Sequence, residues 1–319
     1  MAVAKVGGYT DYSSASASQY TAQYFSLTAL KRYYDALILS DISNTDYIGE
    51  ITGKGDKITI RTIPDVTISP YNKGEQINFE NVASTAVTLT IDFADKFAFE
   101  LNDIDIHNMD MDWMAKFAEN AGIRLKIAAE TIVFANAIAQ IDASNKGNTA
   151  GRVTAAYDMG VAATPLIVNK ANIIDTITDM GSILDEQNVP PGDRYVILPP
   201  HIIGLLKKSD LKNVSITGDG VSPIRNGLIG EIDGFKIYSS NILPKNGSVD
   251  SNGASLGIGT NGYACLFGHK DALAFASTID KVEQIRLPSG FEEAMKGLHV
   301  YGFKVVQPKL MGVAFLATK

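Results

Sequence analysis

The sequence predicts an α+β fold, in which antiparallel strands accompany one long helix and a segment of alternating helix and strand. Three patterns predict it. Apolar and polar residues alternate between residues 56 and 101, apolar residues recur every three or four positions from 112 to 142, and short apolar runs alternate with helical patterns from 165 to 270. With 319 residues, the chain can form one large domain or two medium ones.

Composition and charge exclude several classes of protein. A hydrophobic share of 45% and a charged share of 20% are ordinary for a soluble globular chain. The formal net charge of −7 argues against a protein that grips nucleic acid, because phosphate binding needs clustered Lys and Arg. No apolar stretch is long enough for a membrane span, and the N-terminus lacks the apolar region of a secretory signal. We therefore expect no membrane contact and folding in a reducing cytosol.

The N-terminal part begins with a polar, low-complexity arm over residues 1–25, which has too few apolar residues to build a core. This arm is either a disordered tail, which the sequence by itself favours, or a segment that becomes ordered against a neighbouring subunit. Residues 26–40 predict a short amphipathic helix. Its apolar stripe comprises Leu27, Leu30, Tyr34, Leu37 and Ile38.

Residues 56–101 predict a long antiparallel hairpin, because apolar side chains alternate with polar ones at period two. The alternating apolar positions are Ile58, Ile60, Val66, Ile68, Val87, Leu89, Ile91 and Phe93. Residues 69–74 supply a turn with Pro, Asn and Gly. A two-stranded ribbon is marginal in isolation, so it needs a surface to lie against. That surface is another copy of the protein in an assembly or, alternatively, the rest of the same chain.

Residues 112–142 predict the longest helix, about 45 Å long at 1.5 Å per residue. Asp110 and Asp112 stand at its start, where carboxylates cap free amides and suit the helix dipole. The loop 145–148 ends it. Its predicted apolar stripe comprises Met114, Phe117, Ala121, Leu125, Ala128, Ile132, Ala135 and Ile138.

The remainder of the chain predicts an α/β segment followed by returning strands. A helix begins at Asn172, a buried strand covers 195–198, and Pro200 begins a second helix. A strand pair turns around Asp233–Gly234. Residues 272–319 are again β-like, with apolar strands at 300–306 and 310–316 separated by Pro308, which cannot lie within a central ladder.

Two glycine-rich motifs resemble enzyme signatures. Residues 257–262 match G-x-G-x-x-G, but an apolar strand follows where a dinucleotide site needs a helix, so turn glycines explain them. Residues 253–257 match a nucleophile elbow, with Asp280 and His299 in hydrolase order. The sharp strand-to-helix turn of an elbow is not indicated. We therefore assign no catalytic and no cofactor-binding residue.

The acidic stretch 103–112 is the best metal candidate, since it begins like a calcium loop. Asn108 replaces the glycine at the sixth position, and Met114 replaces the bidentate glutamate at the twelfth. The histidines show no zinc-ligand spacing. Helix-capping acids explain the stretch, so no metal ligand is assigned. Cys265, the single cysteine, lies in an apolar run and predicts a small buried thiol.

The order of these elements, with three local segments, resembles the tailed-phage major capsid proteins of the Hong Kong 97-type fold. The segments are RYVILPP at 194–200, GEIDGFKIYSSN at 230–241 and VYGFKVVQP at 300–308. The resemblance covers almost the whole chain and implies four parts: an N-terminal arm and short helix over 1–50, an E-loop over 51–101, a peripheral domain with a spine helix over 102–164 and 271–319, and an axial domain over 165–270.

The resemblance implies a function in assembly. Copies of the chain would form hexamers and pentamers of an icosahedral shell around double-stranded DNA, without sequence-specific binding, after assembly in the host cytoplasm. The arm is too short to be a fused scaffold, so a separate scaffolding protein is expected, with a portal. The candidate subunit contacts are Ile60, Arg61, Ile63, Tyr71, Lys73 and Phe79. No lysine–asparagine crosslink is assigned.

Three alternatives stay open at this point. An encapsulin-like compartment would have the same fold around a cargo enzyme, and gene neighbours would distinguish it. Another virion component, such as a decoration or tail protein, would form small rings or tubes instead of closed shells. An enzyme would need convergent polar groups in an apolar pocket, which the motifs do not indicate.

Overall fold

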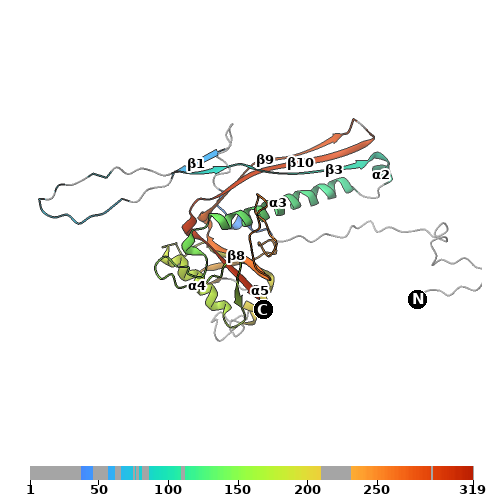
Figure 1. The fold of residues 1–319 in the computed structure, drawn as a ribbon. Coiled ribbons are helices and arrows are strands. Elements are labelled where there is room, and N and C mark those ends of the chain that lie inside the picture. The colour runs from blue at the N-terminus through green and yellow to red at the C-terminus, as the bar shows by residue number, and fades with distance from the viewer. Residues whose placement is uncertain are drawn as a thin grey trace, which may run out of the picture.

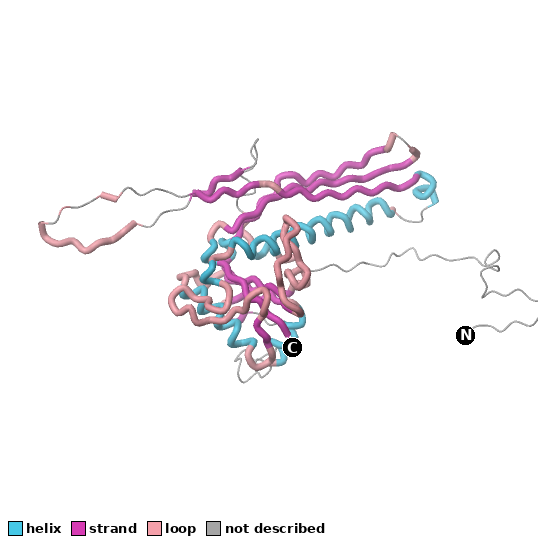
Figure 2. Tube along the Cα trace, viewed as in Figure 1, coloured by secondary structure: helices cyan, strands magenta, loops and turns pink. Residues whose placement is uncertain are grey.

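The computed structural model describes residues 37–45, 57–61, 66–74, 76, 79–80, 86–108, 112–209, 231–288 and 290–318. Figure 1 shows a rounded lower part, built on a six-stranded sheet, and an elongated upper part, in which a long helix runs beside a three-stranded sheet. A thin ribbon extends from the upper part away from both. Helices, strands and loops are distinguished in Figure 2, which confirms the predicted α+β class.

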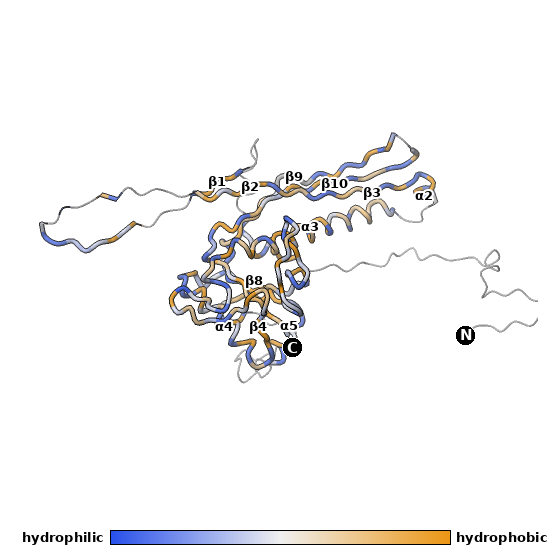
Figure 3. The backbone as a smooth tube through the Cα atoms, in the orientation of Figure 1, coloured by the Kyte–Doolittle hydropathy of each residue, from blue (hydrophilic) through white to orange (hydrophobic). Residues whose placement is uncertain are grey.

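The six-stranded sheet forms the core of the lower part. Its strand order is β4-β11-β8-β5-β7-β6, with β4 at Leu166–Val168, β11 at Met311–Thr318, β8 at Gly262–His269, β5 at Arg194–Leu198, β7 at Phe235–Ser239 and β6 at Glu231–Ile232. The helices α4 (Ile173–Glu186) and α5 (Pro200–Lys208) belong to this part. Every residue of β5 is buried, as its apolar run predicts. The hydropathy colouring in Figure 3 shows apolar residues around β8.

Three local predictions in this part are confirmed. Asp233 and Gly234 have φ values of 51° and 74°, and they join β6 to β7 in a tight antiparallel turn. Cys265 is fully buried on β8, and burial raises the pKa of its thiol well above the usual range. The glycine motif at 257–262 leads directly into strand β8 and not into a helix, as expected for turn glycines.

The upper part consists of α3 (Trp113–Gln140) and a three-stranded sheet with the order β3-β10-β9. Its strands are β3 at Phe93–Asn102, β10 at Glu292–Val305 and β9 at Leu273–Arg286. The predicted long helix is therefore confirmed. Asp112 caps it, since its Oδ1 accepts a hydrogen bond from the Ala115 amide at 3.1 Å. Asp110 lies outside the described residues.

The apolar stripe predicted for α3 is only partly covered. The C-terminal half of the helix enters the core, where Val133, Phe134 and Ala137 are fully buried. Near its start, Phe117 remains 39% exposed, although it packs edge-on against Phe99 of β3 with ring centroids 5.8 Å apart. Within one subunit, the helix thus keeps accessible apolar surface over its first turns.

The ribbon is confirmed at its base and differs from the prediction beyond it. β1 (Lys57–Arg61) pairs antiparallel with β2 (Ala86–Thr90). Val66 and Ile68, predicted to lie in a strand, are in exposed irregular backbone, and Ile68 is 94% exposed. The alternation that begins in β2 continues into β3, which pairs with β10 instead of the ribbon. The predicted hairpin limit at 101 is therefore too late, because Phe93 already stacks on Tyr301 and Phe303 in the sheet.

Other segments also differ from expectation. The helix predicted at 26–40 falls mostly outside the described residues, and its described end forms only α1 (Leu39–Ile42). The acidic stretch begins as the helix α2 (Asp103–Asn108) and not as a calcium-type loop. The tail strands divide as Pro308 predicts, but β11 lies between β4 and β8 in the lower sheet, whereas β10 lies in the upper one. No described helix is long and apolar enough to cross a membrane.

Candidate assembly surfaces

The ribbon carries the most exposed apolar side chains that the structure describes. Phe79 is 95% exposed, and Tyr71 and Val66 are also well exposed on the same extension, which points away from the body in Figure 1. Opposite segments of the ribbon are linked beyond the paired strands, because the Glu80 carboxylate accepts from the Thr67 amide at 3.1 Å. Large exposed apolar groups of this kind mark surfaces that contact another molecule.

The structure describes five of the six predicted contact residues and divides them into two groups. Tyr71, Lys73 and Phe79 lie on the exposed extension, and Arg61 is exposed at the end of β1. Ile60 instead faces its own chain, where it packs with Ile58 against a small cluster of Leu89, Ala274, Ala276 and Val306. Ile63 lies outside the described residues. The ribbon base is therefore anchored within the subunit, whereas its outer part is available for contacts.

A second exposed surface lies at the far tip of the upper sheet. Phe291 and Ile104 are well exposed there, beside a network of charges. Arg286 of β9 bonds to Asp103 of α2, and Glu293 of β10 accepts from Gln284 at 2.9 Å. The network ties the turn between β9 and β10 to α2, which presents the apolar side chains on a fixed framework.

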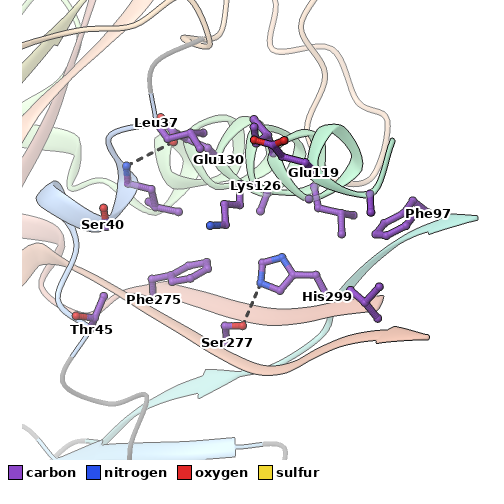
Figure 4. A pocket seen from close by; sticks show the side chains of 17 residues that line it. Leu37, Ser40, Thr45, Phe97, Glu119, Lys126, Glu130, Phe275, Ser277 and His299 are labelled. Carbon is purple, nitrogen blue, oxygen red and sulfur yellow. Dashed lines mark hydrogen bonds between the residues drawn. The ribbon is translucent and has the colours of Figure 1, made fainter. Parts of the chain in front are cut away.

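A cavity of about 690 Å³ separates α3 from the three-stranded sheet (Figure 4). Its apolar lining includes Phe97, Ile123, Leu125, Phe275 and Val282. Sequence analysis did not predict this cavity, because its walls come from α1, β3, α3, β9 and β10. No local pattern in a sequence indicates which distant segments will enclose a space.

The polar groups of this cavity are Glu119, Lys126, Glu130, Ser277 and His299. Figure 4 shows His299 and Ser277 pointing toward one another across neighbouring strands, with Oγ and Nε2 3.0 Å apart. A serine–histidine pair of this kind can serve a hydrolase. Here both residues lie on neighbouring strands of the β9–β10 ladder, next to its register shift between Val300 and Tyr301. The pair by itself does not define a catalytic site, which also needs oxyanion donors and a group that orients the histidine.

Glu130 is the residue that sequence reasoning missed. It stands on the buried side of α3 and is only 1% exposed. The sequence signal that could have indicated its burial is the position of this carboxylate, between Ala129 and Ile132 in a mostly apolar stretch of the helix. Among the described residues, no group of three or more His, Cys, Asp or Glu could hold a metal ion.

Comparison with known proteins identifies the family. A sequence model described as a phage capsid protein matches residues 86–313, which is more than half of the chain. The chain belongs to the phage capsid protein family. No curated protein matches it significantly.

Solved capsid structures are similar over nearly the whole length. That of Mycobacterium phage Che8 has a TM-score of 0.73 at 23% identity, covering 92% of this chain and 96% of that chain. The capsid protein of cyanophage P-SCSP1u has a TM-score of 0.72 at 17% identity, covering 95% and 94%. That of bacteriophage PhiM1 has a TM-score of 0.68 at 15% identity, covering 94% and 92%. These findings confirm the predicted Hong Kong 97-type fold and the prediction of a phage major capsid protein.

Proposed function

We propose that this capsid protein assembles, through repeated contacts between its own copies, into hexamers and pentamers of an icosahedral head that encloses double-stranded DNA. The observation that carries the proposal is the ribbon, whose Phe79 is almost fully exposed far from the core of its own subunit. A lone two-stranded ribbon is marginally stable, so a neighbouring subunit that covers it would stabilise both. Closed shells repeat such contacts by symmetry.

The ribbon carries charges of both signs. Over residues 57–90, Lys57, Arg61 and Lys73 are balanced by Asp65, Glu75 and Glu80, whereas the whole chain has a net charge of −7. Charges of opposite sign that meet across an interface would favour correct pairing over random association. A stable pair would bury about 1,600 Å² in total. We therefore propose Arg61, Tyr71, Lys73 and Phe79 as contacts between subunits, with Ile63 as a further candidate from the sequence.

The partners and the division of the chain follow from the same proposal. We propose a separate scaffolding protein and a portal, assembly in the host cytoplasm, and a final location in the virion. The acidic chain would enclose DNA without gripping it, because it lacks the cationic excess that phosphate binding needs. The lower part would serve as the axial domain and the upper part as the peripheral domain. A structural role without catalysis fits this arrangement.

The test is assembly of the purified full-length chain, with its scaffolding partner supplied, followed by negative-stain microscopy and sedimentation. The variant Phe79→Ser should fold like the wild type, because the side chain is exposed, but form few or no closed shells. The matched control is Val153→Ser, an apolar residue of the lower part that is 78% exposed. The control should assemble normally. A wild-type chain that stays monomeric at high concentration, or a Phe79 variant that assembles as well as the control, would contradict the proposal.

A further inference from the structure

Glu130 connects two segments that lie far apart in the sequence. Its two carboxylate oxygens accept hydrogen bonds from the Ile38 amide at 3.3 and 3.2 Å, and one of them accepts from the Leu39 amide at 3.4 Å. Figure 4 marks a hydrogen bond to the Glu130 carboxylate at the rim of the cavity. These amides begin α1, so a side chain of the long helix supplies the acceptor that the short helix lacks at its start.

Burying the Glu130 carboxylate to make these hydrogen bonds costs the free energy of its hydration. A carboxylate that is 1% exposed has lost its hydration, and among the described residues no ion pair compensates Glu130. Burial raises the pKa of Glu130 to about 7, against the opposing effect of the hydrogen bonds from Ile38 and Leu39. The buried group therefore changes its charge near neutral pH instead of near pH 4.5.

The other charged groups around Glu130 face the same cavity or point elsewhere. Glu119 and Lys126 of α3 line the cavity, and His299 of β10 lines its opposite wall. Asp41 of α1 acts on Tyr238 of β7, whose pKa it helps to raise. Burial is thus the main factor that disfavours the ionised form of Glu130. The Ile38 and Leu39 amides are the groups that bond directly to its carboxylate.

We propose that Glu130 is a proton-controlled clasp, which holds the segment Leu37–Asn44 on the long helix and holds it more tightly when the carboxyl group is protonated. The other end of this segment is fixed independently of protons. The Asn44 amide donates to the Leu273 carbonyl at 2.8 Å, and the Phe275 amide donates to the Asn44 carbonyl at 3.1 Å. The clasp therefore controls the N-terminal end of the segment, which residues 1–36 precede in the sequence.

The direction of the pH effect follows from linkage. When the segment is released, Glu130 is hydrated and titrates near its ordinary pKa of 4.5, whereas in the docked state it titrates near 7. The docked state binds the proton more strongly, so docking is tightest below pH 4.5 and weakens as the pH rises to 7. Between pH 5 and pH 8, the docking equilibrium constant should fall on the order of 10- to 100-fold. Above pH 8 it should change no further.

Hydrogen exchange of the full-length unassembled chain tests the clasp. Protection factors of the backbone amides in residues 38–43 are measured from pH 5 to pH 8 after correction for intrinsic exchange rates. In the wild type they should fall progressively from pH 5 and level off above about pH 7. In Glu130→Gln, which keeps an acceptor oxygen but cannot ionise, they should stay high and independent of pH. Glu119→Gln, on the same helix and cavity, is the matched control and should behave like the wild type.

Two results would overturn the inference. One is wild-type protection in residues 38–43 that does not change with pH. The other is a Glu130→Gln chain with the wild-type pH profile, and His299→Gln would then show whether the histidine is responsible. If Glu130→Gln fails to fold, His299→Gln is measured instead. A fall in protection with pH that is the same in His299→Gln as in the wild type excludes the histidine and supports Glu130 as the titrating group. The clasp is a property of the subunit, so its failure would leave the shell proposal intact.

Discussion

Gly302 of β10 lies where the base of the ribbon passes over the three-stranded sheet, and it has no room for a side chain. A Cβ added there would collide with the carbonyl oxygen of Thr90 and approach the Cα of Ile91 to 2.9 Å. Both obstacles are backbone atoms of the junction between β2 and β3. They can yield only if the strand that carries the ribbon shifts as a whole. We therefore expect Gly302→Ala to displace the ribbon and to destabilise the subunit.

The size of the effect follows from what must move. Overpacking a buried site costs about 1–3 kcal/mol, and an obstacle made of backbone belongs at the upper end, so we expect a loss of about 3 kcal/mol. The matched control is Gly297→Ala, five positions earlier on the same strand. There the three atoms nearest to the added Cβ all belong to the ring of Phe97, a half-buried side chain at the cavity, which can turn into that space. The control should lose about 1 kcal/mol or less.

Urea unfolding of the unassembled subunit, followed by circular dichroism, measures both losses as shifts in the transition midpoint. Shell formation measured in parallel should fail for Gly302→Ala and persist for Gly297→Ala. Equal midpoints for the two variants would refute the reasoning, since it depends on the difference between a backbone obstacle and a mobile side chain.

Three further predictions concern the lower part and the core. Phe134→Ala removes a fully buried ring of α3 and should lower the free energy of unfolding by about 3–5 kcal/mol in urea titration. Arg194→Met should lower the free energy of unfolding by about 3 kcal/mol, because the buried guanidinium bonds to Asp185 at 2.6 Å and to the Pro190 carbonyl at 2.9 Å. Its control is Lys236→Met, which removes an exposed ion pair and should leave the midpoint of urea unfolding unchanged. Cys265 should react with a thiol reagent only as fast as the chain unfolds, because burial raises its pKa and blocks access.

The sequence predicted elements whose signal is local. The apolar spacing and the cap at Asp112 placed the long helix within a few residues of Trp113–Gln140. The apolar run at 195–198 and the Asp233–Gly234 turn were likewise sufficient by themselves. In each case, the residues that determine the element lie within it, so no knowledge of distant partners was needed.

The sequence did not predict features that depend on a change of partner. Alternation continues from β2 into β3, yet the pairing partner changes from β1 to β10 between Thr90 and Phe93. A period-two pattern reports that a strand has two faces, not which strand lies beside it. The sequence likewise did not predict which side of α3 is buried, because the sheet and α1 cover different parts of the helix. The role of Glu130 could not be predicted from its neighbours in the sequence, because the amide that donates to it belongs to Ile38, 92 positions away.

The first residues of β9 hold both the segment Leu37–Asn44 and the base of the ribbon. Leu273 and Phe275 use their backbone to hold Asn44, the end of the segment that follows the arm. The side chains of Ala274 and Ala276, which alternate with them, are buried in the cluster with Leu89 of the ribbon base. Because the backbone groups of a strand lie in the plane of the sheet whereas its side chains project from that plane, one short stretch can make both contacts without competition. A shift of this stretch should therefore act on the segment Leu37–Asn44 and on the ribbon base together.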